Sequence, residues 1–227
     1  RVNKASMVET MNVLGMKTGI LYRADRAEYS KAYRGAAATV AGQPSMLARP
    51  LQQEYESSLA RPISLVIAGS AGGKVRSTAA ALGRGAVISG LWASQRDDYP
   101  TTVMSGHSVS EVILSPQEIR YTGIPRPDAM AVLTGDGLRV VRSQIARLGP
   151  EARLYWNVEL GEVETKACKI PLDFTTAGAR ATRENLAILA VAAMVRRENL
   201  YPSAALADAI TLGQKAHIAQ ENLEAVT

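Results

Sequence analysis

The chain has 227 residues, 47% of them hydrophobic and 21% charged, which is the balance of a globular protein with one sizeable core and an appendage. A single Cys excludes an internal disulfide framework, and one Cys with two His cannot by themselves hold an iron–sulfur cluster or a structural zinc ion. The net charge of +5 comes from Lys and Arg residues scattered along the chain, and only one Phe and two Trp could stack on bases, so we expect no nucleic-acid binding. The basic residues are expected to form a solvated surface or a docking face for an acidic partner.

Residues 1–61 have a pattern of their own. Met7, Met11 and Leu14 recur at helical spacing, and the alanine-rich residues 27–40 favour a helix. Three prolines between residues 42 and 62 then indicate a connecting arm. We predict that residues 1–61 form an N-terminal extension that packs on a partner subunit.

From residue 62 the pattern alternates between strand and helix. A β-branched apolar run at 63–68 predicts a buried strand, a glycine-rich turn follows, and residues 75–88 have helical character. Further strands are predicted at 90–94, 108–114, 129–133 and 154–158, with a helix over 138–148. Such repeated units predict an α/β domain over residues 62–227, in which a mostly parallel, Rossmann-like sheet has helices on both faces.

The last fifty residues predict helices at 182–199, 203–212 and 215–225. The apolar stretch from Leu186 to Val195 is about half of the ~20 residues that a bilayer crossing requires, so it predicts a buried helix. His217 falls on a predicted surface helix and needs no special role. Because no export signal opens the sequence, we expect a cytoplasmic protein without membrane association.

The glycine-rich turn after the first strand is the clearest candidate ligand site. Backbone N–H groups converge in such a turn, and the helix N-terminus behind them favours an anion. Equally, the glycines allow a tight turn and close helix–sheet packing. The spacing fits neither a Walker A loop nor a G-x-G-x-x-G fingerprint, because three residues separate Gly69 from Gly73 and Lys74 stands at the third glycine position. The candidate binding residues of this turn are Gly69, Ser70, Gly72, Gly73 and Lys74.

A second polar stretch covers residues 97–115. His107 and Asp97 are a candidate acid–base pair, although a loop histidine satisfied by its neighbours is the commoner arrangement. Residues 106–110 lack the closing glycine of a nucleophile elbow, so we do not expect a serine hydrolase. No residue stands out as catalytic.

Taken in order, these segments resemble the gamma subunit or domain of the 2-oxoacid:acceptor oxidoreductases, which include pyruvate, indolepyruvate and aryl-glyoxylate ferredoxin oxidoreductases. Residues 67–75 are similar to the family's G-x-G-G-Q-G-V segment, with Lys74 in place of Gln. Three further segments resemble the family in the same order along the chain. Residues 128–133 are similar to its D-V-L-V-A-L strand, residues 182–190 to its G-N-x-x-x-x-x-A-L-G helix, and residues 222–225 to its closing N-x-x-A helix. Residues 99–115 stand where the family has a loop and a strand, which makes Tyr99, His107 and Ser108 candidate ligand contacts.

The resemblance implies a division of labour. Thiamine-binding alpha and beta subunits would hold thiamine diphosphate, Mg²⁺ and the 2-oxoacid, an iron–sulfur subunit with 4Fe–4S clusters would carry electrons away, and coenzyme A (CoA) would take the acyl group. This chain would hold no cofactor alone and would not be catalytic by itself. As a gamma-type subunit of a hetero-oligomer that oxidatively decarboxylates a 2-oxoacid to acyl-CoA, it would be mainly architectural and help shape the CoA side of the site.

Two other functions remain open from the sequence. One is a dinucleotide-binding domain of a dehydrogenase, with Asp97 or Asp98 on the ribose. The other is a non-enzymatic scaffold. The N-terminal segment is likewise open, because residues 17–22 are weakly similar to the tail of a thiamine-binding beta chain, so residues 1–61 are either an arm or the end of a fused beta chain.

Overall fold

The computed structural model describes residues 51–98, 106–175 and 181–226. The chain divides into two units, Arg1–Arg49 and Pro50–Thr227, and all described residues belong to the second. Residues 1–50 of the predicted extension therefore lie outside the described residues, and the role of the extension stays a prediction.

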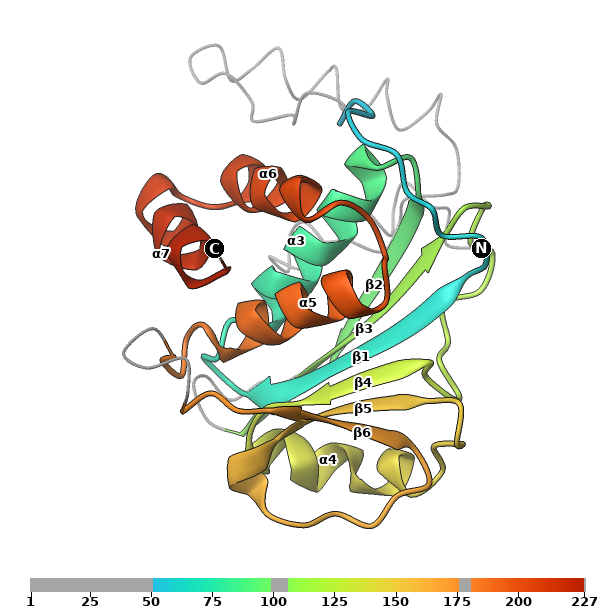
Figure 1. Ribbon diagram of the computed structural model, residues 1–227, viewed down its shortest axis with the longest axis vertical. Helices are drawn as coiled ribbons and strands as arrows, with labels where there is room; N and C mark the ends of the chain where they lie inside the picture. The colour runs from blue at the N-terminus through green and yellow to red at the C-terminus, as the bar shows by residue number, and fades with distance from the viewer. Residues whose placement is uncertain (1–50, 99–105, 176–180, 227) are drawn as a thin grey trace, which may run out of the picture. The chain divides into compact units, whose positions relative to one another are not determined.

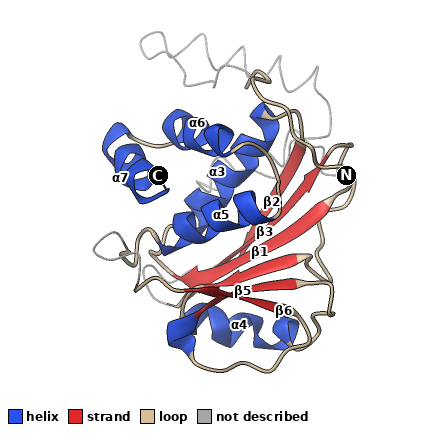
Figure 2. Ribbon diagram, viewed as in Figure 1, coloured by secondary structure: helices blue, strands red, loops and turns tan. Residues whose placement is uncertain are grey.

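A six-stranded sheet forms the centre of the described domain (Figures 1 and 2). Its order is β2-β3-β1-β4-β5-β6. Strands β1, β4, β5 and β6 pair in parallel, whereas β3 pairs antiparallel with both β1 and β2. Five strands thus run in one direction, which confirms the predicted α/β class with a mostly parallel sheet. The strands are β1 Ile63–Ser70, β2 Trp92–Asp98, β3 His107–Ser115, β4 Ala129–Val132, β5 Arg153–Asn157 and β6 Cys168–Leu172.

Helices cover both faces of the sheet, as predicted (Figure 1). One face carries α3 Val75–Ile88, α5 Leu186–Arg197, α6 Ser203–Gly213 and α7 Ala216–Val226. The opposite face carries α4 Gly135–Ile145. A short 3-10 helix, Val158–Leu160, follows β5. The three C-terminal helices agree with the expected helical C-terminus, and none of the described helices is long and apolar enough to cross a membrane.

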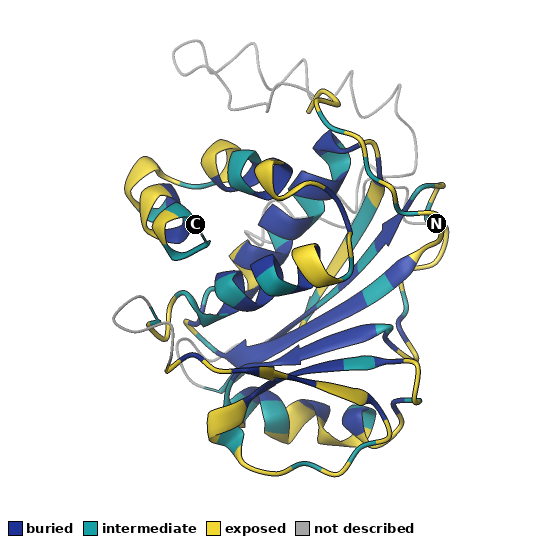
Figure 3. Ribbon diagram, in the orientation of Figure 1, coloured by how far each residue is buried: buried dark blue, intermediate teal, exposed yellow. Residues whose placement is uncertain are grey.

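Alternation along β1 explains why the core has two halves. Leu65 and Ile67 point to the α3 side, and Val66 and Ala68 point to the α4 side. All four side chains are fully buried, because a parallel strand covered on both faces has no solvent side (Figure 3). The chain leaves β1 for α3 on one face and leaves the neighbouring strand β4 for α4 on the other. The carboxyl ends of β1 and β4 are therefore the switch point of the sheet, the position where ligands bind in doubly wound sheets.

Three strands were not fully predicted. β2 begins at Trp92 and continues through Asp98, where the sequence predicted a strand over 90–94 and then a polar loop. Its exposed, charged residues obscured the strand, because an edge strand needs little hydrophobicity. β3 is the strand that runs antiparallel in the mostly parallel sheet, and the sequence did not indicate which strand this would be. β6 was not predicted; it is a short edge strand with Pro171, which breaks the usual strand signal.

Residues 51–61 lie against the domain as an extended segment. Glu54 and Tyr55 donate their backbone N–H groups to the carbonyl of Ile88 at 2.8 and 2.9 Å. The Tyr55 hydroxyl donates to Asp208 of α6 at 2.5 Å, and this bond, with burial and the nearby carboxylates, raises the pKa of Tyr55. The segment thus connects the end of α3 to α6 before β1 begins.

Candidate functional site

The turn that joins β1 to α3 contains the predicted binding residues in an unusual backbone conformation. Gly72 has a φ of +82°, and Lys74, which is not a glycine, also lies in the left-handed region with φ 53° and ψ 19°. Ala71 donates its N–H to the Gly106 carbonyl at 2.8 Å, and Gly73 donates to the Ser70 carbonyl at 3.0 Å. The turn is therefore held by one backbone hydrogen bond of its own and one to Gly106 just before β3, with Gly72 supplying a conformation that L-residues rarely adopt.

Two helix N-termini meet beside this turn, and they differ in how they are capped. At α4, the Thr134 hydroxyl accepts from the Gly137 N–H at 3.4 Å, and Asp136 lies in the first turn. At α3, the N-cap residue Lys74 makes no side-chain cap, and the first turn holds no acidic residue. An uncapped helix start leaves N–H groups and the positive end of the helix dipole for an anion.

Ser70 joins the turn after β1 to the start of α4. Its Oγ lies 2.9 Å from both Thr134 Oγ1 and Asp136 Oδ2. Asp136 also pairs with Arg139 on the same helix. The hydroxyl of Ser70 thus links the ends of β1 and β4 and faces the α4 side of the sheet.

The side chain of Lys74 is held by carboxylates. Its Nζ lies 3.0 Å from Glu184 Oε2, just before α5, and 3.8 Å from Glu221 Oε2 on α7. Arg183 donates from Nη2 to the Ala71 carbonyl at 2.9 Å. Two cations therefore flank the turn, and an arriving anion would have to compete with two exposed carboxylates for Lys74.

The other predicted ligand contacts, Tyr99, His107 and Ser108, fall partly outside the described residues. His107 and Ser108 pair with Ser70 and Gly69 across β3 and β1, so the structure brings them to the glycine turn. Tyr99 lies outside the described residues. The predicted pair of His107 with Asp97 is wrong, because Asp97 bonds to Ser110 Oγ at 2.6 Å on the α3 side, whereas His107 Nε2 lies 3.7 Å from Asp98 Oδ2 on the α4 side.

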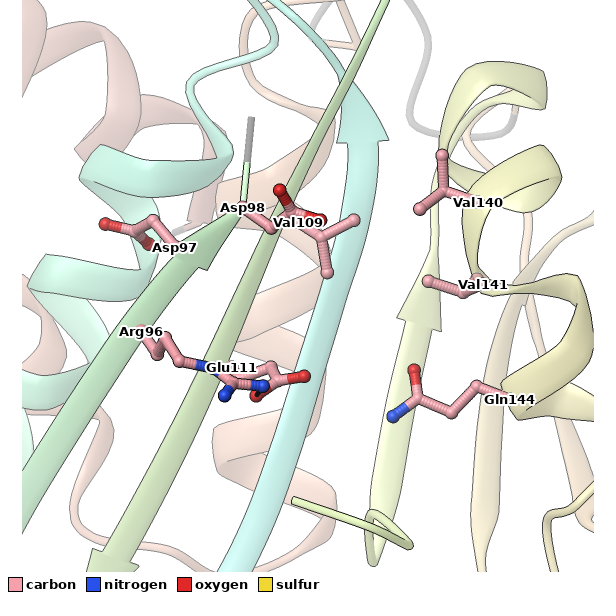
Figure 4. Close-up of a pocket in the computed structure, with 8 residues that line it drawn as sticks. All are labelled: Arg96, Asp97, Asp98, Val109, Glu111, Val140, Val141 and Gln144. Atoms are coloured by element: carbon pink, nitrogen blue, oxygen red, sulfur yellow. Dashed lines mark ion pairs between the residues drawn. The ribbon is translucent and has the colours of Figure 1, made fainter. Parts of the chain in front are cut away.

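A pocket of about 330 Å³ opens on the α4 side between β2–β3 and α4 (Figure 4). Val109, Val140 and Val141 form its apolar part. Glu111 and Arg96 form an ion pair at 2.6 Å across its floor. The pocket is lined by Arg96, Asp97, Asp98, Val109, Glu111, Val140, Val141 and Gln144. The carboxylates of Asp98 and Glu111 lie on this side of the sheet, and the one arginine is already paired with Glu111, so the pocket does not suit a phosphate.

The sheet order argues against the dinucleotide-binding alternative. In a dinucleotide fold, the acidic residue that binds the ribose ends the strand next to β1. Here β3 lies between β1 and β2, so Asp97 and Asp98 are two strand spacings, or roughly 9.5 Å, from the strand that leads into the glycine turn. In addition, the Asp97 carboxylate already forms an ion pair with Arg76 and accepts a hydrogen bond from Ser110.

The sequence analysis missed several residues beside the turn. Thr134 and Asp136 were not among the predicted site residues, although a Thr followed by an acidic residue before a helical pattern is a helix-start signal that would have indicated them. Glu184 and Glu221 carry no local signal, because they reach Lys74 only through the fold. In the parts of the chain that the structure describes, no group of three or more His, Cys, Asp and Glu residues could hold a metal ion, and Cys168 is exposed.

Comparisons with known proteins give the same fold. The gamma subunit of a keto/oxoacid ferredoxin oxidoreductase from Geobacter sulfurreducens PCA is 18% identical with a TM-score of 0.59, covering 72% of this chain and 94% of that one. Pyruvate oxidoreductase subunit PORC from Thermotoga maritima is 14% identical with a TM-score of 0.58, covering 73% of this chain and 93% of that one.

A larger neighbour is 2-oxoglutarate:ferredoxin oxidoreductase from Magnetococcus marinus, solved with 2-oxoglutarate, coenzyme A and succinyl-CoA bound. It is 15% identical with a TM-score of 0.62, covering 74% of this chain but 30% of that one. No curated protein matches. The family model for pyruvate ferredoxin/flavodoxin oxidoreductases matches residues 64–227, and the chain therefore belongs to that family, as the sequence resemblance predicted.

Proposed function

We propose that this chain is the gamma-type subunit of a CoA-dependent 2-oxoacid:acceptor oxidoreductase. Its partners would be thiamine-binding alpha and beta subunits and an iron–sulfur subunit, which would hold thiamine diphosphate, Mg²⁺ and 4Fe–4S clusters. The proposal is supported by the family membership and by the fold shared with two subunits of such enzymes. In this role the chain is mainly architectural and borders the CoA side of the site.

The uncapped start of α3 is the observation that most favours a CoA contact. CoA carries a pyrophosphate and a ribose phosphate, and its phosphates would approach the N–H groups at the start of α3, beside Lys74 and Arg183, because the Gly73 N–H is already donated to the Ser70 carbonyl. The switch point at the carboxyl ends of β1 and β4 is also the expected ligand position for this sheet order. The chain's own residues would bind and orient the phosphates; bond making would occur on the other subunits.

Lys74→Ala is expected to raise the apparent KM for CoA of the assembled enzyme about five-fold, the equivalent of about 1 kcal/mol of binding. The KM for the 2-oxoacid should stay unchanged, because only the phosphate contact is lost. Steady-state kinetics with varied CoA measures the effect. Lys169→Ala is the matched control, since it removes an exposed, ion-paired lysine at the opposite edge of the sheet.

The competing function is a scaffold without a ligand at this turn, and the two ion pairs of Lys74 favour it. In that case Lys74→Ala leaves the CoA dependence at the wild-type value. Gly72→Val would still impair assembly, because its positive φ cannot accept a β-branched side chain. That combination of results would reject the CoA contact while leaving the subunit role intact.

A further inference from the structure

Another pocket, with a volume of about 280 Å³, opens at the amino-terminal ends of β1 and β5. Its walls come from the segment before β1, from the starts of the two strands and from the end of α5. The glycine turn lies at the opposite, carboxyl-terminal end of β1, so none of the residues proposed to contact CoA belongs to this pocket. We call it the arginine pocket, and it is lined by Ser58, Leu59, Ala60, Arg61, Ile63, Arg153, Glu198 and Asn199.

Asp128 anchors both arginines of the pocket. Its Oδ1 lies 3.2 Å from Arg61 Nη1, and its carbonyl accepts from the Arg153 N–H at 3.0 Å. Its Oδ2 accepts from the N–H and from the hydroxyl of Ser64, at 2.8 and 2.7 Å. Both oxygens of the Asp128 carboxylate therefore already have a donor.

The carboxylate that lines the pocket, Glu198, is engaged in the same way. Its Oε2 lies 2.5 Å from Arg153 Nη2, and its Oε1 accepts from the Tyr155 hydroxyl at 2.5 Å. The Glu198 side chain is 3% exposed, so it is closed to solvent as well. Neither Asp128 nor Glu198 thus has a carboxylate oxygen without a donor.

The two arginines, in contrast, have more N–H groups than acceptors. A guanidinium group carries five N–H donors. Among the described residues, the Arg153 side chain forms an ion pair with Glu198 alone, and the Arg61 side chain with Asp128 alone. Arg153 Nε is buried without a hydrogen-bond acceptor, an arrangement that costs free energy. Since Arg61 is 69% and Arg153 32% exposed, both side chains are accessible to a group that enters the pocket, and such a group has to supply acceptors.

The formal charge around the pocket is slightly positive. Its two arginines balance the two carboxylates described above. The last turn of α5 adds Arg196 and Arg197, and Glu56 precedes the wall segment that begins at Ser58. These flanking residues contribute one net positive charge, so the surroundings favour an anion over a cation.

The apolar part of the pocket narrows the class of anion. Leu59, Ala60 and Ile63 form an aliphatic wall beside the two guanidinium groups. An inorganic phosphate has no apolar part to cover such a wall, whereas a carboxylate on a short methylene chain does. The planar carboxylate also matches the hydrogen-bonding geometry of a guanidinium group.

We propose that the arginine pocket binds a carboxylate carried on a short aliphatic chain. Arg61 and Arg153 donate to the carboxylate, and the methylene groups pack on Leu59 and Ile63. Two sources offer this chemistry: an acidic side chain of a partner subunit, and a small free carboxylic acid.

Isothermal titration calorimetry of the full chain with Nα-acetylglutamic acid amide tests the carboxylate site. We expect saturable binding of this probe, and about ten-fold weaker binding of the neutral Nα-acetylglutamine amide, because a charge-assisted hydrogen bond is lost. Arg61→Gln should weaken binding of the acid about ten-fold for the same reason. Arg61 is exposed, so this variant should keep the wild-type melting temperature.

Arg120→Gln is the matched control, because it removes an arginine that is 86% exposed and does not line the pocket. It should leave the affinity for the acid at the wild-type value. The proposal is overturned if the wild-type chain does not bind the acid, if it binds acid and amide equally, or if Arg61→Gln binds the acid as wild type does.

The same titration on the assembled complex separates the two sources. If a partner supplies the carboxylate, the complex does not take up the probe, and Arg61→Glu raises the dissociation constant of this chain from its partners about ten-fold through like-charge repulsion. If the ligand is a free acid, the complex binds the probe as the full chain does, and Arg61→Glu leaves assembly unchanged. A complex that excludes the probe and still tolerates Arg61→Glu overturns the proposal. The titration of the full chain needs no partner, so its result is independent of the subunit role.

Discussion

Replacement of Arg153 by alanine is expected to lower the free energy of unfolding by about 1–3 kcal/mol, because it removes a partner of a buried carboxylate although the Arg153 side chain itself is 32% exposed. Arg153 Nη2 lies 2.5 Å from Glu198 Oε2, and the side chain of Glu198 is 3% exposed. The Tyr155 hydroxyl also donates to Glu198 at 2.5 Å, and burial together with this bond raises the pKa of Tyr155. Without Arg153, the buried carboxyl group of Glu198 keeps the hydrogen bond from Tyr155 but loses its ion pair.

Arg61→Ala is the matched control for this effect. Arg61 also pairs with a carboxylate, Asp128, at 3.2 Å, but its side chain is 69% exposed. An exposed pair is worth about 0–1 kcal/mol, so the two arginines should differ several-fold in urea denaturation of the full chain. Similar losses for both variants would show that Glu198 relaxes toward solvent and that the pair is not a buried one.

Gly137→Ala is expected to destabilise the domain by about 3 kcal/mol, at the upper end of the range for overpacking. A β-carbon at Gly137 would lie 2.6 Å from the carbonyl carbon of Ala68 and 2.6 Å from the nitrogen of Gly69. Both atoms belong to the backbone at the end of β1, which is fixed on both sides by the sheet, so no side-chain movement relieves the contact.

Gly135→Ala provides the comparison two residues away. A β-carbon at Gly135 meets no atom within 4 Å, and alanine favours the helix over glycine by up to about 1 kcal/mol. Thermal unfolding should therefore separate the two variants in opposite directions. If Gly137→Ala unfolds at the wild-type temperature, α4 is not pressed against β1 as closely as the structure places it.

The sequence predicted the elements whose signals are local. The helix over 75–88 agrees with α3 at both ends, because a glycine turn begins it and its apolar residues follow helical spacing. The strand at 63–68 and the three C-terminal helices were likewise found. What was missed is non-local: nothing in residues 107–115 says that the strand inserts antiparallel between β1 and β2, since that choice depends on pairing with residues about forty positions away.

The same distinction holds for the candidate site. The turn from Gly69 to Lys74 was predicted from its glycines, and its placement at the carboxyl end of β1 is as expected. The carboxylates around Lys74 could not be predicted in this way. Glu184 and Glu221 lie more than a hundred residues further along the chain, and they approach Lys74 only when α5 and α7 pack on α3. Lys74 appeared in the sequence as a free cation and is ion-paired in the fold.

The insertion of β3 has a consequence for the order in which the chain can acquire structure during synthesis. β2 leaves the ribosome before β3 does, yet its neighbour in the described sheet is β3. β2 must therefore wait, attached to α3, until residues 107–115 have been made and have paired with β1. A nascent chain stalled between these two strands would expose the edge of β1 and the side of α3 that later contacts β2, which are the surfaces a chaperone would recognise.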